Sequence, residues 1–261
     1  MRSLLVLVLI ITAVIYLSMQ GYDCVDIIGG HDVKSNSRLY MASIQINKTH
    51  VCGGALIKPQ WVLTAAHCSK RMTVAETEVV VGSHSLSKQE NKQTIKLKKT
   101  FPHPNFTWDS VGYDIMLLQL RNKAILNKFV STLKLPKSTK SVKPGTKCSV
   151  AGWGKDGTKS YPDTLKEANI TVLKMEICKK IYSLNLTNDM ICALGQDSKQ
   201  DVCEGDSGGP LLCKKWFRQN VYSGIVSFGS HCGDNIKPGV YTHLSNNYLS
   251  WINKVIHAAS Y

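Results

Sequence analysis

The sequence predicts an all-β protein that ends in one α-helix. Short runs typical of β-strands recur along the chain, among them Glu78–Val81 and Val221–Phe228, and each of these two is followed by a glycine. Pro-Gly pairs at 144–145 and 238–239 mark turns between such runs. Near the end of the chain, apolar residues recur at helical spacing instead. We therefore expect many short strands followed by a terminal helix.

The N-terminal segment predicts a signal peptide. Arg2 precedes an apolar stretch from Leu4 to Leu17, and a polar segment, Ser18–Asp23, follows. The stretch is short for a membrane span, which needs ~20 apolar residues, and no basic flank follows it. We expect residues 1–24 to be removed as a signal peptide. The alternative interpretation is that this segment is a membrane anchor. Because no second apolar run of this length occurs, no membrane span is expected in the mature chain.

The predicted terminal helix is amphipathic. Ser245 or Asn246 is the expected N-cap, because such side chains accept hydrogen bonds from the free N–H groups that begin a helix. The apolar residues that fall on one face are Tyr248, Trp251, Ile252, Val255 and Ile256.

Composition and charge narrow the function classes. The chain has 261 residues, a hydrophobic fraction of 43% and a charged fraction of 19%, which argues against a disordered chain. This length allows one or two domains. The 32 Lys and Arg residues outnumber the 18 Asp and Glu residues, for a formal net charge of +14. That surplus favours polyanionic partners such as nucleic acid, acidic glycans or an anionic membrane surface.

The nine cysteines indicate disulfides. No CxxC pair with zinc-finger spacing occurs, so a structural metal site is not expected. Disulfides require an oxidising compartment, and the predicted signal peptide would direct the chain to one. The odd count leaves one cysteine without a partner.

Two segments and one aspartate contain the candidate catalytic residues. His67 lies in the segment Leu63–Cys68, and Ser207 lies among glycines in the segment Cys203–Pro210. Asp114 stands between them in the chain. Glycines let a backbone turn sharply and direct its N–H groups at an incoming oxygen. Taken alone, the glycine-rich segment could be an ordinary turn, and His67 could be structural.

Together, in the order His, Asp, Ser, these residues resemble the chymotrypsin/trypsin family of serine proteases. The resemblance runs from Ile27 to the terminal helix, and it implies two packed antiparallel six-stranded β-barrels that divide near residues 130–140. It implies that Ser207 attacks the scissile carbonyl, His67 takes the serine proton and Asp114 orients the imidazole. The N–H groups of Gly205 and Ser207 would bind the oxyanion.

The same resemblance implies no cofactor. Ser83 stands where the calcium loop of trypsin supplies a carboxylate, so we expect no metal.

The segment Ile27–Gly30 resembles the mature N-terminus of the family, whose α-ammonium pairs with an aspartate, here Asp206. The residue before Ile27 is Asp26, whereas a trypsin-cleaved precursor has Lys or Arg there. Signal cleavage after Cys24 would leave residues 25–26 as an acidic dipeptide, as in granule proteases of lymphocytes and myeloid cells. Residues 27–261 would then form the protease domain.

Loss of Cys24 leaves eight cysteines. The resemblance pairs them as Cys52–Cys68, Cys148–Cys213, Cys178–Cys192 and Cys203–Cys232. The alternative keeps Cys24 in the mature chain for an intermolecular bond.

Substrate preference follows from Asp201, which occupies the position that floors the primary specificity pocket in this family. A buried carboxylate there implies cleavage after Arg or Lys, because it rewards a cationic side chain. Ser227, Gly229 and Gly239 match the pocket walls, where small residues leave room for a long side chain.

Within the family, segments such as His84–Lys88 and Leu133–Pro136 look most like the tryptic granzymes A and K, proteases of cytolytic granules. Granzyme A dimerises through a cysteine after its Phe-Pro-x-Pro segment. Here Phe101–Pro104 is followed by Asn105, so we expect a monomer of the granzyme K type. A protease of the granzyme A type is the alternative.

Loss of residues 1–26 removes one cation and two anions, which raises the formal charge from +14 to +15. We expect this charge to bind acidic proteoglycan in storage granules; a dispersed solvated surface is the alternative. Nucleic acid is not expected as a partner, because no recognised binding motif accompanies the charge.

Four N-x-Ser/Thr sequons predict glycosylation, at Asn47, Asn105, Asn169 and Asn185. Two other functions stay open. One is a catalytically weak heparin-binding or antimicrobial homologue, and the other is a mast-cell or digestive tryptic protease.

Overall fold

Six antiparallel strands close the first barrel in the computed structural model, which describes residues 31–89, 91–138, 140–155, 162–195, 205–215, 220–229 and 237–259. Around the barrel the strands follow the order β2-β3-β4-β7-β6-β5, and pairing of β5 with β2 closes the ring. The strands are β2 (Met41–Ile46), β3 (Thr49–Lys58), β4 (Trp61–Thr64), β5 (Thr77–Val81), β6 (Gln93–Pro102) and β7 (Met116–Leu120).

The hairpin between β2 and β3 shows how the local sequence builds this barrel. Asn47 and Lys48 form a two-residue loop with φ values of 50° and 65°. Two successive positive φ values match the twist of the flanking strands, and Asn tolerates them well. Side chains such as Ile44, Leu56 and Leu117 fill the interior, where each is fully buried.

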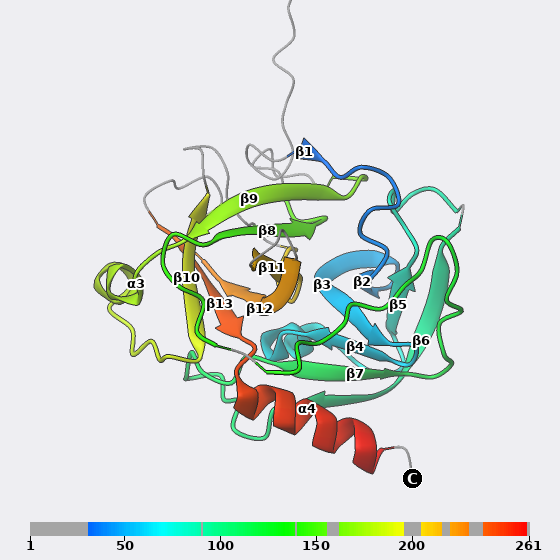
Figure 1. Ribbon diagram of the computed structural model, residues 1–261. Helices are drawn as coiled ribbons and strands as arrows, with labels where there is room; N and C mark the ends of the chain where they lie inside the picture. The colour runs from blue at the N-terminus through cyan, green and yellow to red at the C-terminus, as the bar shows by residue number, and fades with distance from the viewer. Residues whose placement is uncertain are drawn as a thin grey trace, which may run out of the picture.

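Six further strands close the second barrel, in which pairing of β8 with β9 completes the ring. They are β8 (Lys147–Gly152), β9 (Lys166–Val172), β10 (Met190–Gly195), β11 (Pro210–Lys214), β12 (Asn220–Phe228) and β13 (Gly239–His243). A short strand, β1 (His31–Asp32), pairs with β9 as a seventh member of this sheet. The predicted fold, two antiparallel six-stranded barrels and a terminal helix, is confirmed (Figure 1).

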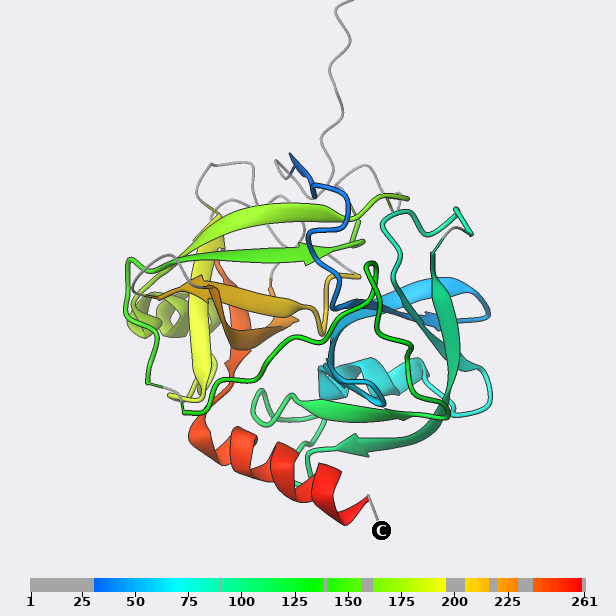
Figure 2. The same ribbon diagram turned by 45° about the vertical axis from the view of Figure 1, so that its right-hand side comes forward.

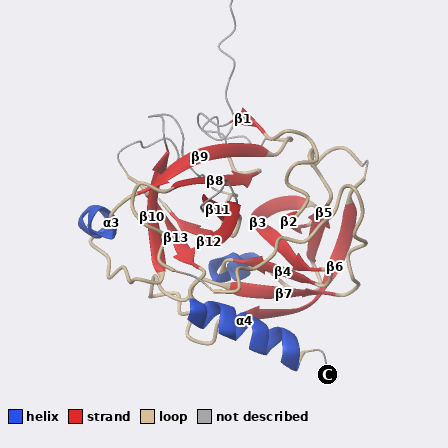
Figure 3. Cartoon of the chain, viewed as in Figure 1, coloured by secondary structure: helices blue, strands red, loops and turns tan. Residues whose placement is uncertain are grey.

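The terminal helix, α4 (Asn246–Ala258), covers the outside of the first barrel beside β7 (Figures 1 and 2). Its N-cap is Ser245, and Tyr248, Ile252 and Ile256 are buried as the apolar pattern predicts. All five residues of β7 are buried, because the strand lies between the barrel interior and this helix. Figure 3 shows α4 and the short helix α3 (Met175–Tyr182) outside the barrels.

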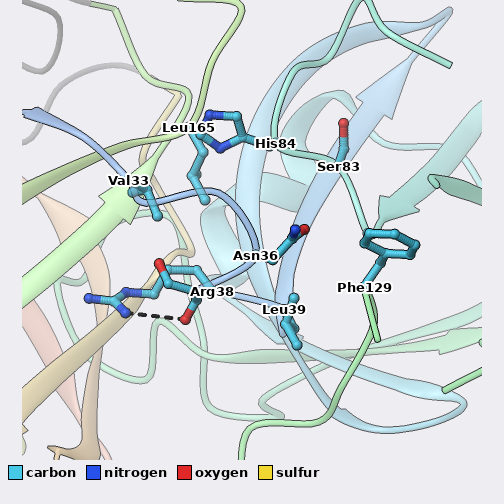
Figure 4. A pocket seen from close by; sticks show the side chains of 10 residues that line it. Val33, Asn36, Arg38, Leu39, Ser83, His84, Phe129 and Leu165 are labelled. Carbon is cyan, nitrogen blue, oxygen red and sulfur yellow. Dashed lines mark hydrogen bonds between the residues drawn. The ribbon is translucent and has the colours of Figure 1, made fainter. Parts of the chain in front are cut away.

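The segment before β2 joins the two barrels. The Val33 N–H donates to the Leu165 carbonyl at 3.0 Å, and the Leu165 N–H donates to the His84 carbonyl at 2.8 Å. Figure 4 shows the pocket where this segment, with Arg38 and Leu39, meets His84 and Leu165. The chain passes from β7 to β8 through a long connection (Figure 2). Its first part is bonded to the first barrel, where the Leu133 N–H donates to the Leu56 carbonyl at 2.7 Å, and Val142 near its end packs on the core of the second barrel.

Three of the four predicted disulfides lie within the described residues and are confirmed: Cys52–Cys68, Cys148–Cys213 and Cys178–Cys192. Cys203 and Cys232 lie outside the described residues. Among the described helices, none has both the length and the apolar character that crossing a bilayer demands.

Candidate active site

His67 lies in a short helical turn that a disulfide and a side-chain hydrogen bond hold in place. The strand β4 ends at Thr64, and the 3-10 helix η1 (Ala66–Arg71) begins two residues later. The Cys52–Cys68 disulfide ties this turn to β3, and the Ser69 hydroxyl donates to the Ala66 carbonyl at 2.7 Å. The backbone next to His67 is therefore fixed on both sides of the residue.

His67 and Asp114 form a doubly hydrogen-bonded pair. The His67 ring donates from Nδ1 to Asp114 Oδ2 at 2.8 Å, and the His67 backbone N–H donates to Asp114 Oδ1 at 2.9 Å. Both carboxylate oxygens thus accept from one residue, which fixes the rotation of the imidazole ring. With Nδ1 as the donor, the neutral ring has its lone pair on Nε2, which suits this atom for general-base catalysis.

Asp114 is an ionised carboxylate inside the protein. Only 5% of the residue is exposed, and the Ser227 hydroxyl also donates to Oδ2. Burial by itself raises the pKa of this carboxyl, but the hydrogen bonds from His67 and Ser227 outweigh burial and hold the pKa below its usual value. The Thr242 hydroxyl donates to the Asp114 carbonyl at 2.9 Å, so β13 also positions this residue.

Ser227 was assigned to the pocket wall from sequence, and its hydroxyl is directed at Asp114. Nothing in the spacing of the chain predicts this contact, because Ser227 lies 113 residues from Asp114. The serine therefore supports the carboxylate that orients His67.

Ser207 lies in a tight turn that both barrels hold. Its carbonyl accepts from the Gly53 N–H of β3 at 2.8 Å, and the next N–H, that of Gly208, donates to the Val226 carbonyl of β12 at 2.8 Å. Gly208 has a φ of 82°, and an added Cβ there would lie 2.0 Å from Thr64 Oγ1. Only glycine fits at this point, because it combines a left-handed backbone with close contact to β4.

The structure brings the Ser207 backbone close to the His67 ring. Cys68 Sγ lies 3.8 Å from the Ser207 carbonyl oxygen and 4.0 Å from His67 Nε2. Cys52, His67 and Cys68 offer ligand atoms within 4.8 Å of one another, but both sulfurs are bonded to each other and are not thiolates. The disulfide therefore serves here as a support for the two catalytic candidates.

His50 is a buried residue of the site that the sequence analysis did not identify. Its Nε2 lies 2.9 Å from the Gly205 carbonyl oxygen, and its Nδ1 lies 2.8 Å from Ser43 Oγ. Burial lowers the pKa of His50 to about 4, although the hydrogen bond to Gly205 acts in the opposite direction. The neutral ring thus donates to Gly205, accepts from Ser43, and fixes the peptide between Gly205 and Asp206.

Asp206 lies in a space that two glycines leave for it. The residue is 2% exposed, and its Oδ1 accepts from the Gly154 N–H at 2.9 Å. A Cβ added to Gly152 or Gly154 would lie 2.1 Å or 2.4 Å from the carboxyl group. Ile27, the predicted partner of Asp206, lies outside the described residues.

The structure brings the predicted pocket walls together. A Cβ added to Gly229 would lie 3.8 Å from the Gly239 Cα, so the two glycines lie next to each other. A Cβ added to Gly239 would instead lie 3.1 Å from the hydroxyl oxygen of Tyr241. The Tyr182 hydroxyl donates to the Pro238 carbonyl at 2.7 Å and holds the segment before Gly239. Asp201 lies outside the described residues.

Comparisons with known proteins agree with this geometry. The Trypsin protein family matches residues 27–252 of the chain. Granzyme A of Bos taurus is 44% identical over 243 residues, which cover 90% of each chain. Trypsin of Sus scrofa is 40% identical over 235 residues, which cover 89% of this chain and 96% of that trypsin.

A solved structure supports the same assignment. The structure of mouse neuropsin, a serine protease expressed in the limbic system of the brain, matches with a TM-score of 0.78 and 35% identity. The match covers 87% of this chain and 99% of neuropsin. Sequence, fold and the arrangement of His67, Asp114 and Ser207 thus lead to one conclusion: the chain belongs to the trypsin family and is a serine protease, a hydrolase of peptide bonds.

Proposed function

We propose that the protein is an endopeptidase that cleaves after Arg and Lys through an acyl-enzyme intermediate. The observation that carries this proposal is the hydrogen-bonded pair of His67 and Asp114 next to the Ser207 turn. His67 Nε2 takes the proton of the Ser207 hydroxyl as its oxygen attacks the scissile carbonyl carbon. The leaving amine then takes that proton from His67, and water repeats the sequence to release the acyl group.

The N–H groups of Gly205 and Ser207 bind the oxyanion in this proposal. Contacts within the turn support it. The Asp206 carbonyl, in the peptide that carries the Ser207 N–H, accepts from the Gly209 N–H at 2.9 Å, and His50 and Gly53 hold the carbonyls of the adjacent peptides, those of Gly205 and Ser207. A turn whose carbonyls are tied to the protein presents N–H groups without reorganisation during the reaction.

The support that Ser227 gives to Asp114 is testable. Replacement of Ser227 by Ala removes a donor from a buried carboxylate, and we expect kcat to fall about tenfold with little change in KM. Steady-state kinetics on an Arg substrate measure the effect. The matched control is Ser223→Ala on the same strand, whose hydroxyl donates to the Val221 carbonyl instead. Equal kcat values for the two variants would contradict the proposed role.

The preference for Arg and Lys rests on Asp201 at the pocket floor and on Gly229 and Gly239 in its walls. Trypsins are among the relatives, and the two glycines lie next to each other and bring no side chains into the pocket. A carboxylate at the end of such a pocket rewards a guanidinium or an ammonium group.

We expect the activated enzyme to hydrolyse Arg and Lys peptide substrates faster than Phe or Asp substrates. Asp201→Ser removes the buried charge and should lower kcat/KM on Arg substrates at least about 100-fold. A Phe substrate is the internal control, because its cleavage does not depend on that carboxylate. Preferred cleavage after Phe or Asp by the unmodified enzyme would refute the assignment.

Activation depends on Asp206 in our proposal. Removal of residues 1–24 as a signal peptide and of residues 25–26 as a dipeptide frees the α-ammonium of Ile27, which pairs with the Asp206 carboxylate. Gly152 and Gly154 support this role, because any side chain at either position would displace the Asp206 carboxyl group. A buried carboxylate without a cation is costly, so the longer chain holds the Ser207 turn less well.

A chain that begins at Val25 should therefore be at least about 100-fold less active than one that begins at Ile27. Initial rates on an Arg substrate measure the difference, and circular dichroism checks that both chains fold. Equal rates would show that the dipeptide has no effect on the active site.

We further propose a granzyme-like protease, secreted or stored in cytolytic granules of lymphocytes. The 44% identity to granzyme A and the acidic residue before Ile27 support this role. All four sequon asparagines are exposed, so each is open to glycosylation in the secretory route. Asn105 stands where granzyme A has its dimer-forming cysteine, which favours a monomer.

Acidic proteoglycan is the storage partner that the basic surplus favours. We expect the mature protein, with a formal charge of +15, to bind immobilised heparin at low salt and to elute as NaCl rises. Absence of retention at low salt would refute the storage role. Retention without labelling of Ser207 by a fluorophosphonate would instead favour a catalytically weak heparin-binding homologue.

A further inference from the structure

Tyr113, the residue before Asp114, has a backbone conformation that aromatic residues rarely adopt. Its φ is 58°, in the left-handed region. Among the described non-glycine residues with a positive φ, Tyr113 alone is aromatic, whereas three are asparagines. Asparagine enters this region readily, but a bulky side chain there costs free energy, so the surrounding structure must hold it. Such a residue next to the active-site carboxylate calls for a physical explanation.

Tyr113 begins a three-residue turn that is centred on Asp114. The Ile115 N–H donates to the Tyr113 carbonyl at 2.8 Å, which closes the turn. The Ile115 carbonyl accepts from the His103 N–H at 3.0 Å, and the Asp114 carbonyl accepts from the Thr242 hydroxyl at 2.9 Å. All three carbonyls of the turn are therefore bonded, and the backbone of the turn sets the direction of the Asp114 side chain.

The ring of His103 holds the side chain of Tyr113. The two rings are stacked, with their centroids 4.9 Å apart and an angle of 16° between their planes. Burial lowers the pKa of His103, so its ring is neutral at pH 7, and its Nδ1 accepts from the Asn105 N–H at 3.2 Å. Trp251 packs against the same ring, with the centroids 5.0 Å apart. The ring on which Tyr113 stacks is thus itself fixed.

The hydroxyl of Tyr248 holds the backbone of Tyr113. Tyr248 is 3% exposed, and its hydroxyl is hydrogen-bonded to the Tyr113 backbone. Burial raises the pKa of Tyr248 and this bond acts in the opposite direction, so the donor is the Tyr113 N–H. Because Tyr248 and Trp251 both belong to α4, the terminal helix supports the residue that precedes Asp114.

We propose that Tyr113 is a positioning residue of the active site. Its left-handed backbone, held by the His103 stack and by the Tyr248 hydroxyl, directs the Asp114 carboxylate at His67. This inference rests on the catalytic role of Asp114 proposed above. Both hydrogen bonds from His67 to the carboxylate, at 2.8 and 2.9 Å, depend on that direction, so a relaxed turn would misalign the imidazole.

Substitutions at position 113 separate the backbone from the ring. Tyr113→Phe keeps the stacked ring and should keep kcat. Tyr113→Asn loses the ring but adopts the left-handed conformation readily, so kcat should fall no more than about threefold. Tyr113→Val loses the ring and, being β-branched, disfavours this conformation, so kcat should fall at least about 20-fold with little change in KM. Steady-state kinetics on an Arg substrate measure these effects.

The matched control is Lys48→Val, because Lys48 has a φ of 65° in the exposed loop between β2 and β3. Both valine variants should lose thermal stability, which unfolding followed by circular dichroism measures. Only Tyr113→Val should lose kcat. Equal kcat values for the two variants, whether both are kept or both are reduced, would overturn the proposal.

The proton on His67 Nδ1 gives a second readout that does not require turnover. It is hydrogen-bonded to Asp114 Oδ2, and a proton in such a bond resonates far downfield in the NMR spectrum. We expect Tyr113→Val to move this resonance upfield, while Tyr113→Phe and Lys48→Val leave it in place. An unchanged resonance in Tyr113→Val would contradict a positioning role.

The stack is tested from its other side by two variants of His103. Both lose the acceptor of the Asn105 N–H, but His103→Phe keeps a flat ring and His103→Leu does not. We expect His103→Leu to have a kcat about tenfold below that of His103→Phe, at similar KM. Equal kcat values would show that the stack does not support the turn.

Failure of the proposed catalytic role gives a different result from failure of this inference. If Asp114 had no catalytic role, Asp114→Ala would keep the kcat of the unmodified enzyme. If only the inference about Tyr113 were wrong, Asp114→Ala would lose activity while Tyr113→Val kept it.

Discussion

The buried carboxylate of Asp114 is the constraint on which the arrangement of the site depends. A charge inside a protein must be compensated by hydrogen bonds, and here the donors come from both barrels. His67 supplies two donors from the first barrel, while Ser227 and Thr242 of the second barrel hold the carboxylate and the carbonyl of the same residue. The requirement to pair one carboxylate therefore also fixes how the two barrels meet.

Close packing is the second constraint, and it acts on the turn that carries Ser207. Gly208 contacts β4 so closely that a Cβ would overlap Thr64, and Gly152 and Gly154 leave room only for the Asp206 carboxyl. Hydrogen bonds from Gly53 and to Val226 then tie the turn to both barrels. The backbone of Ser207 is therefore held in one conformation, as the proposed oxyanion site requires.

Sequence reasoning was accurate where the signal is local. Strands bounded by turn residues, the amphipathic helix at Asn246–Ala258 and the motifs around His67 and Ser207 can each be recognised within ten to fifteen residues. Three disulfides followed from the family resemblance, since cysteine spacing alone leaves many pairings open. Ser227 was placed near the substrate, but its hydroxyl bond to Asp114 was not foreseen.

The sequence alone determined the family and the identity of the three catalytic candidates, because each stands in a motif whose neighbours are adjacent in the chain. Only the tertiary structure decided which residues support them. His50 meets Gly205 across 155 residues, and Ser227 meets Asp114 across 113. Such contacts depend on the closure of the barrels, which brings together side chains that no local pattern relates.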